Sequence, residues 1–203
     1  DGGNGSGGWL FTEVTADLGQ SNHAQTSWAD FDGDQDLDLL VIHIAPLTED
    51  GFIRRFRNDG DGVFVGEDIL GTLTVEHGEA QWGDSDDDGD LDLVCCNGYS
   101  HDVGVFLNDG SGGLTVQAPL YPVGESPQFL ELRDFTGDRV VDVVTVNAIE
   151  ESVSLLRGNG DGTFTPTAGG PQPTGGRTWV VALDDIDGDG DLDASTANST
   201  NNT

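Results

Sequence analysis

Aspartates stand at every second position of residues 30–38, and an apolar run follows directly (DFDGDQDLDLLV, residues 30–41). Carboxylates packed this closely repel one another unless a cation neutralises them. Hard divalent cations bind oxygen ligands, and calcium takes six to eight of them in irregular geometry. A tight loop can supply these oxygens from side chains at its positions 1, 3, 5 and 9 and from the backbone carbonyl at position 7. The stretch therefore predicts a calcium-binding loop; the alternative is an acidic, solvated turn without a metal.

The same stretch returns three times, so chance does not explain it. The first aspartates of the four copies are separated by 54, 50 and 51 residues. The ligands predicted for the first two loops are Asp30, Asp32, Asp34 and Asp38 with the carbonyl of Asp36, and Asp84, Asp86, Asp88 and Asp92 with the carbonyl of Asp90. Those predicted for the last two loops are Asp134, Thr136, Asp138 and Asp142 with the carbonyl of Val140, and Asp185, Asp187, Asp189 and Asp193 with the carbonyl of Asp191. We expect one calcium ion for each loop, about four in all.

The third loop is predicted to be the weakest of the four sites. It has Thr136 where other copies have aspartate, and Arg139 places a positive charge inside the loop. An EF-hand is excluded for all four loops, because it needs an acidic ligand at position 12 and helices on both flanks. The residues at position 12 are Val41, Cys95, Thr145 and Thr196.

The elements that must position these loops are short strands. A strand-like segment precedes each loop, a β-branched run follows it, and a further strand leads to a glycine-rich turn such as NDGDG or GNGDG. Asn-Gly and Asp-Gly turns between apolar runs are strong hairpin signals. No segment has a sustained helical period. The sequence thus predicts an all-β, β-propeller-like array of four-stranded antiparallel blades, with about four repeats of 50–54 residues.

The domain prediction is a single propeller spanning residues 1–203, or part of a longer one. The repeats are anchored at 30–67, 84–117, 134–167 and 185–203, and residues 9–14 match the last strand of a blade. The fourth copy breaks off after its second strand. An incomplete blade leaves an open strand edge, which invites self-association with another chain. With no signal peptide at Asp1, we expect a mature or excised segment.

Composition narrows the choice of partners. The chain carries a formal net charge of −31, so nucleic acid and anionic membrane surfaces are not expected as partners. No apolar stretch approaches the roughly 20 residues that membrane insertion requires. The two cysteines, Cys95 and Cys96, are expected to be small buried apolar residues, with a strained vicinal disulfide as the alternative.

Some further side chains carry expectations of their own. Trp28 and Trp82 each stand two residues before a loop and are expected in the core, with sugar stacking as the alternative. His101 breaks the symmetry of the repeats and is expected at the surface. Asn97, together with its counterparts Asn147 and Asn198, is expected to cap a turn rather than to bind a ligand.

The acidic loop, the Trp-x-Asp before it and the later Asn-x-Gly-x-Gly-x-Phe turn resemble FG-GAP/VCBS repeats, the blades of integrin α-subunit-type propellers. The resemblance covers residues 9 to about 200. It implies calcium in the hairpin loop that joins the first two strands of each blade, and an extracellular, secreted or cell-surface setting. Three positions depart from the family pattern: Asp87, where the family tends to have glycine, and Thr136 and Arg139 in the third loop.

No nucleophile, zinc-protease or nucleotide-binding motif occurs, so an enzyme is not expected. The function expected first is extracellular calcium-dependent binding of a protein or glycan, for adhesion, matrix or surface interaction, with calcium as a structural ion. Two alternatives remain open: a carbohydrate-active propeller of lectin or polysaccharide lyase type, and a self-assembling filament or surface-layer subunit.

Overall fold

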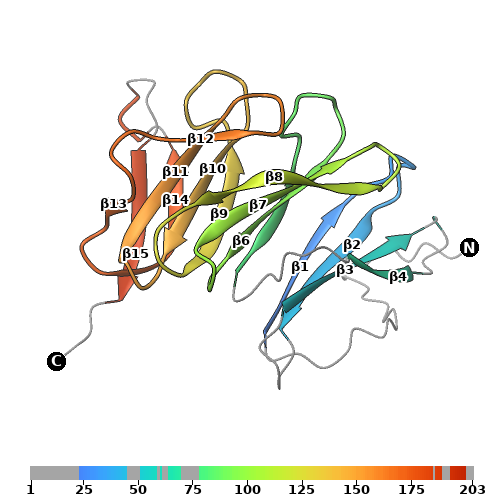
Figure 1. The fold of residues 1–203 in the computed structure, drawn as a ribbon, viewed down its shortest axis with the longest axis horizontal. Coiled ribbons are helices and arrows are strands. Elements are labelled where there is room, and N and C mark those ends of the chain that lie inside the picture. Colours follow the sequence, from blue (N-terminus) through green and yellow to red (C-terminus); the bar gives the residue numbers. More distant parts are fainter. Residues whose placement is uncertain are drawn as a thin grey trace, which may run out of the picture.

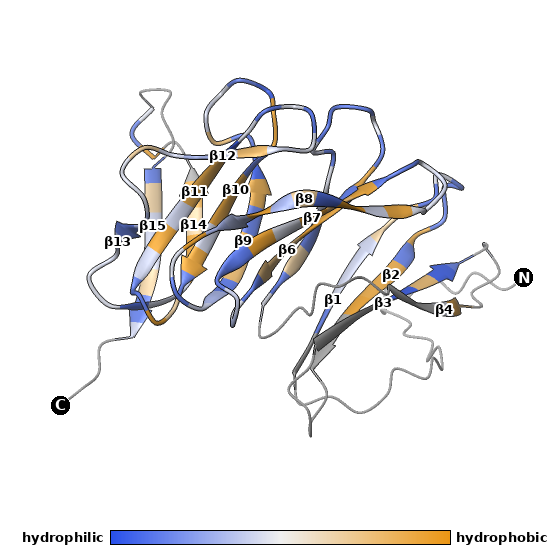
Figure 2. Cartoon of the chain, in the orientation of Figure 1, coloured by the Kyte–Doolittle hydropathy of each residue, from blue (hydrophilic) through white to orange (hydrophobic). Residues whose placement is uncertain are grey.

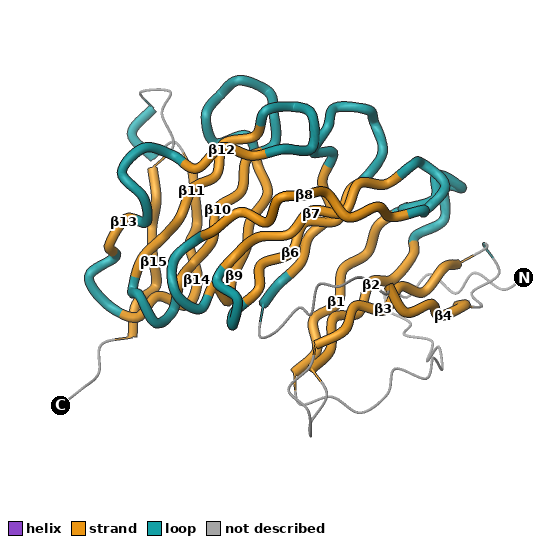
Figure 3. Tube along the Cα trace, in the orientation of Figure 1, coloured by secondary structure: helices purple, strands orange, loops and turns teal. Residues whose placement is uncertain are grey.

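The structure is a computed structural model that describes residues 23–44, 51–58, 60, 64–69, 78–184, 186–188 and 193–199. Every regular element in these residues is a β-strand, as Figure 3 shows. The described part of the chain accordingly has no helix long and apolar enough to cross a membrane. The predicted all-β class is confirmed.

The strands form antiparallel sheets that follow the repeats of the sequence. The first sheet has the order β1 (His23–Ala29), β2 (Asp38–Ile44), β3 (Gly51–Asn58), β4 (Phe64–Ile69). The second has the order β5 (Ala80–Gly83), β6 (Asp92–Asn97), β7 (Asp102–Asn108), β8 (Leu114–Pro122). The third contains β9 (Pro127–Arg133), β10 (Asp142–Asn147), β11 (Ser152–Gly158) and β12 (Phe164–Pro166), and the short β13 (Gln172–Pro173) also pairs with β11. The fourth contains β14 (Arg177–Asp184) and β15 (Asp193–Ser199).

The four sheets lie one after another in chain order, from the blue sheet to the red one in Figure 1. The first strands of successive sheets, β1, β5, β9 and β14, contact one another in turn. This is the arrangement of neighbouring propeller blades, each of which buries its faces against the next. The predicted four-stranded blade is confirmed, and β13 is an addition that the sequence pattern did not indicate. The strand predicted at residues 9–14 lies outside the described residues.

The apolar core lies between the sheets, where Figure 2 shows hydrophobic residues along the central strands. On β6, Leu93 and Cys95 pack toward the first sheet, whereas Val94 and Cys96 pack toward the third. Successive side chains of a strand point to opposite faces, so a strand buried on both faces has a continuous apolar run. All residues of β6 and β10 are buried, as the runs LVCC and VVTV require.

The two cysteines are free and fully buried, as predicted. Their side chains point to opposite faces of β6, so they belong to two different core clusters. Burial raises the pKa of both thiols, that of Cys96 to about 12. Both therefore act as small apolar residues rather than as nucleophiles.

The core prediction is right for Trp82 and wrong for Trp28. Trp82 packs against the core between the first two sheets and stacks on Phe31, with ring centroids 5.7 Å apart. Trp28 is 56% exposed and meets only the edge of Phe64 among aromatic rings of the described residues. Both tryptophans occupy the sheet face that points toward the preceding repeat. No sheet that precedes the first one is among the described residues, and the aromatic contact of Trp28 is made within its own sheet, with Phe64 of β4.

His101 is likewise not a plain surface residue. It is half-buried, and its Nδ1 accepts a hydrogen bond of 3.0 Å from the backbone N–H of Ser126. It therefore ties the β6–β7 turn to the segment that enters the third sheet.

Two side chains at the start of the second sheet, those of Glu79 just before β5 and of Gln81 within it, bind the edge strand of the next sheet. Glu79 Oε2 accepts a hydrogen bond of 3.1 Å from the N–H of Leu130. Gln81 Oε1 accepts one of 3.2 Å from the N–H of Leu132, and Gln81 Nε2 donates to the carbonyl of Leu130 at 2.8 Å. β9 is an edge strand, so these side chains satisfy backbone groups that no neighbouring strand can reach.

Burial of the Glu79 carboxyl raises its pKa above the usual value; the hydrogen bonds from Leu130 and Gln81 oppose this shift, and the charge of Glu131 adds to it. A raised pKa means that the folded state binds the proton more tightly than the unfolded state does. The contribution of Glu79 to stability is therefore fully present below its unfolded pKa and is lost as the pH rises through its folded pKa.

We predict that Glu79→Gln, which cannot ionise, gains stability relative to wild type as the pH rises from 4 to 7. Urea unfolding in chelator at both pH values measures this change in the free-energy difference. Glu125→Gln, at an exposed position, is the control for the loss of one negative charge. A difference for Glu79→Gln that is constant with pH, or that falls toward pH 7, would contradict the expectation.

Candidate metal centres

The acidic loops join the first two strands of each sheet, and loops 1 to 3 lie along the upper edge of the array in Figure 1. Loops 1 to 3 span residues 30–38, 84–92 and 134–142, and each leads into a second strand whose first residue is buried. Loop 4 spans residues 185–193. Asp185, Asp189 and Asp191 lie outside the described residues, so the predicted fourth site is described only at Asp187, which is exposed, and at Asp193.

The aspartate at position 9 is a buried clamp. Asp38, Asp92 and Asp142 are each 0% exposed. In each, Oδ2 accepts the backbone N–H of loop position 2, from Phe31 at 3.1 Å, Ser85 at 2.9 Å and Phe135 at 2.8 Å. In each, Oδ1 accepts the N–H of the last residue of the third strand, from Asn58 at 2.7 Å, Asn108 at 2.8 Å and Gly158 at 2.8 Å. Asp193 repeats the first of these bonds with Ile186, at 3.1 Å. The predicted ligand at position 9 therefore has a structural task as well.

The aspartates at positions 1 and 5 shape the loop backbone. Those at position 1 accept N–H groups from loop positions 4 to 6; Asp30, for example, binds Gly33 and Gln35 at 2.9 Å each. The position 5 carboxylate accepts the N–H of position 7 in all three loops, as Asp88 does from Asp90 at 2.9 Å. These bonds fold the chain back so that its carboxylates face one centre.

Positions 4 and 6 of loops 1 to 3 both take the left-handed conformation, although only one of the two is a glycine in each of these loops. The φ values are 76° and 77° at Gly33 and Gln35, and 61° and 95° at Asp87 and Gly89. Asp87 thus takes the left-handed conformation that the family usually gives to glycine. Aspartate tolerates it better than most residues, because its short side chain can hydrogen-bond locally.

The aspartate at position 3 is the one whose carboxylate is not fully hydrogen-bonded in the first two loops. Asp32 and Asp86 each have a buried Oδ1 with no hydrogen-bond partner in the described part of the chain. Burial raises the pKa of both carboxyls, and the charges of neighbouring aspartates add to this, chiefly Asp34 at the first site and Asp92 at the second. A buried acceptor without a partner costs about 1–3 kcal/mol, and more if charged. A cation bound in each loop would give Oδ1 of Asp32 and Oδ1 of Asp86 the partner that each lacks.

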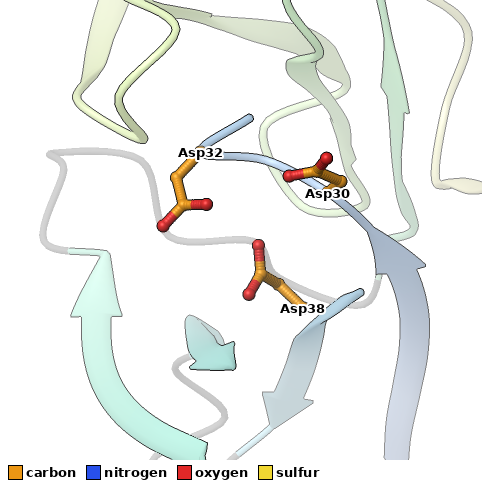
Figure 4. Close-up of side chains that lie close together, drawn as sticks. All are labelled: Asp30, Asp32 and Asp38. Carbon is orange, nitrogen blue, oxygen red and sulfur yellow. The ribbon is translucent and has the colours of Figure 1, made fainter. Parts of the chain in front are cut away.

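The carboxylates converge as an ion requires. Oxygens of Asp30, Asp32 and Asp38 lie within 4.8 Å of one another, and the three side chains face a common centre in Figure 4. Oxygens of Asp84, Asp86 and Asp88 form a second such group. Two oxygens on opposite sides of one calcium ion lie about 5 Å apart, so both groups fit it. No third group of this kind occurs among the described residues, and the predicted ligands Asp34 and Asp92 stand outside the two groups.

The side chain at position 7 points away from the loop centre, toward the turn between the third and fourth strands. A Cβ on Gly60 would collide with the carboxylate of Asp36, and one on Gly110 would collide with that of Asp90. Both glycines also have a positive φ, of 86° and 75°. The arrangement leaves the backbone carbonyl of position 7 as the group available to an ion, which is the role that the sequence predicts.

The third loop differs from the other two. Arg157 donates from Nε and Nη2 to Oδ2 of Asp138, at 3.1 and 2.7 Å, and its guanidinium holds the pKa of that carboxyl below the usual value. Arg139, the cation that the sequence pointed to, has an exposed side chain, and its backbone N–H binds Asp134. Arg157 lies on β11, far from the motif, and only alignment of the third strands of the repeats could have indicated it.

Successive loops are also joined to one another. Asn108 Nδ2 donates to the carbonyl of Phe31 at 2.7 Å, and the N–H of Gly162 donates to the carbonyl of Ser85 at 3.0 Å. In each pair, the turn of one repeat binds position 2 of the preceding acidic loop. The asparagines after the second strands have a separate role: Asn97 Nδ2 donates to Asp102 across the β6–β7 turn at 2.6 Å, as expected of a turn cap.

Tandem four-stranded blades with acidic loops at one edge define a repeat protein of the β-propeller type. Three overlapping segments, residues 30–95, 84–145 and 134–194, match the family described as FG-GAP-like repeat. The chain belongs to this family. No curated protein matches the sequence.

One similar solved structure is the pore of a Tc holotoxin from Photorhabdus luminescens. It is 14% identical over 86% of this chain, with a TM-score of 0.39. The match spans 11% of the length of that toxin chain.

We predict that Asp142→Asn destabilises the protein in the absence of calcium by about 1–3 kcal/mol for each backbone N–H that loses its acceptor. The amide can replace only one of the two carboxylate oxygens, and it points its own N–H groups at donors. Urea unfolding in chelator measures the loss. Asp87→Asn makes the same chemical change on an exposed side chain and should have little effect. Equal stability of the two variants would show that the clamp contributes nothing.

Proposed function

We propose that this protein is an extracellular calcium-binding repeat protein whose loops bind the ion to order the blades, and that it serves in adhesion, matrix or surface interaction. The observation that carries the proposal is the buried, partnerless Oδ1 of Asp32 and of Asp86, each inside a group of three carboxylates. In a loop that never binds a cation, such an oxygen would destabilise the folded state.

The residues of the chain divide the work of holding the ion. In the second loop, Asp84, Asp86 and Asp88 would hold it, and the carbonyl of Asp90 would add a backbone ligand. Asp92 keeps its two backbone bonds and fixes the loop against β6 and β7. Bound calcium would supply positive charge to carboxylates that otherwise repel one another.

Net charge supports the same proposal. A chain of 203 residues with a net charge of −31 repels itself in the compact state, and each bound ion removes two negative charges from that balance. Calcium sites in extracellular modules have dissociation constants on the order of 10⁻⁴–10⁻³ M, which suits loops with few carboxylates. The family resemblance supports a setting outside the cell, where calcium is abundant enough to fill sites of this affinity.

A binding role, rather than catalysis, fits the use of the acidic residues. Two groups of loop aspartates lie close together in the described part of the chain. Their carboxylates accept backbone N–H groups or are directed at the proposed ion. We propose a protein or glycan as the partner. A panel of glycans and matrix proteins, tested for binding and for turnover in the presence of calcium, separates this role from that of a carbohydrate-active enzyme.

The first test is calorimetric titration of calcium into chelator-stripped protein, with thermal melts before and after, on wild type and Asp86→Asn. We expect calcium to bind and to raise the melting temperature of wild type. Asp86→Asn should lower the calcium affinity of the second loop at least about tenfold, because even partners outside the ligand sphere contribute that much.

In calcium we expect wild type to have the higher melting temperature of the two proteins. In chelator we do not expect it to have the higher one. Asp86→Asn removes a buried charge whose oxygen has no partner, so its melting temperature without calcium should equal or exceed that of wild type. A variant that is weaker under both conditions would mean that Asp86 is structural. Absence of heat and of any stabilisation in wild type would overturn the proposed function.

A further inference from the structure

One position outside the acidic motif, the penultimate residue of the third strand, bears directly on the charge of the loop. Its successor is the residue whose N–H binds the position 9 aspartate, so it stands beside the loop in every repeat. This residue is Arg57 on β3, Leu107 on β7 and Arg157 on β11.

In the third repeat the guanidinium of Arg157 forms an ion pair with the position 5 carboxylate, that of Asp138. Two nitrogens of Arg157 bind Oδ2 of Asp138, and the N–H of Val140 binds Oδ1 at 3.0 Å, so both oxygens have partners. The same repeat has Thr136 at position 3, where the other two loops have the aspartate with the orphaned oxygen. Between positions 1 and 9 the third loop has three aspartates, against five in the first loop and six in the second.

In the second repeat the corresponding side chain is apolar. Leu107 packs against the core between the second and third sheets and lies against Gly162. It offers no charge to Asp84, Asp86 or Asp88, so neutralisation of this loop has to come from outside. In the first repeat, the charge of Arg57 favours the ionised form of Asp32, while three carboxylates still converge there.

We infer that the third loop is neutralised by its own Arg157 and takes no calcium. The chain then combines loops that need calcium for their order with one loop that is ordered without an ion. The inference rests on the proposed function for the first two loops. It makes the penultimate residue of the third strand, together with position 3, the determinant of which repeats need calcium. Withdrawal of calcium then loosens the edge of the first and second sheets and leaves that of the third intact.

Hydrogen exchange measured by mass spectrometry in calcium and in chelator tests this on the wild-type protein. We expect calcium to slow exchange at least about tenfold in peptides covering residues 84–92 and to leave residues 134–142 unchanged. Equal protection of both segments by calcium would overturn the inference while supporting calcium binding. Protection of neither segment would overturn the proposed function and the inference with it.

A second test transfers the pattern of the second loop to the third. The double variant Thr136→Asp, Arg157→Leu should bind one more calcium ion than wild type and should melt at a lower temperature in chelator. Arg139→Leu, which removes the other positive charge of the same loop, is the matched control and should leave the number of ions unchanged. Arg57→Leu, at an exposed position, should tighten binding at the first loop several-fold.

The number of ions bound is the deciding measurement. If the double variant binds no more calcium than wild type, Arg157 and Thr136 do not determine occupancy and the inference is wrong. The same holds if Arg139→Leu gains an ion to the same degree.

Discussion

The fold depends on a fully buried carboxylate, that of the position 9 aspartate. The position 9 aspartate lies at the start of the second strand and accepts N–H groups from its own loop and from the end of the third strand. One side chain thus fixes three segments that are distant in sequence, and its burial is tolerable because every oxygen has a charge-assisted hydrogen bond. With this clamp in place, the remaining aspartates have little freedom to move apart. Their mutual repulsion becomes a property of the folded state that an ion can relieve.

The sequence was sufficient to predict the strands and the loops, because these depend on local patterns. An apolar run such as VVTV predicts a strand buried on both faces, and NDGSG predicts the turn that follows. Side chains whose role depends on a distant neighbour were harder to interpret. The partners of Asp142 include Gly158, 16 residues away, and only the register of β10 on β11 brings them together. The exposure of Trp28 was missed for a similar reason, since no pattern in its own strand indicates what lies against it.

Charge is distributed differently in otherwise similar repeats. The second loop is the most acidic and has a leucine beside it; the third has fewer carboxylates and an arginine bound to one of them. Both solutions keep the same backbone, with left-handed residues at positions 4 and 6 and a clamp at position 9. The geometry of the loop is therefore not what separates a repeat that needs an ion from one that does not. The separation comes from the side chains that surround the position 3 and position 5 carboxylates.

The bonds from Asn108 to Phe31 and from Gly162 to Ser85 make each acidic loop a support for the repeat that follows it. In a stacked array, stability is close to a sum of terms within repeats and terms between neighbours. A loop that loses its order weakens the neighbour term on its C-terminal side, because that is where its position 2 carbonyl is used. Because the two repeats share this term, disorder in one blade should spread to its neighbour and should end at a repeat held by its own charges. The third repeat, whose loop is held by Arg157, is the one at which the spread of disorder should end.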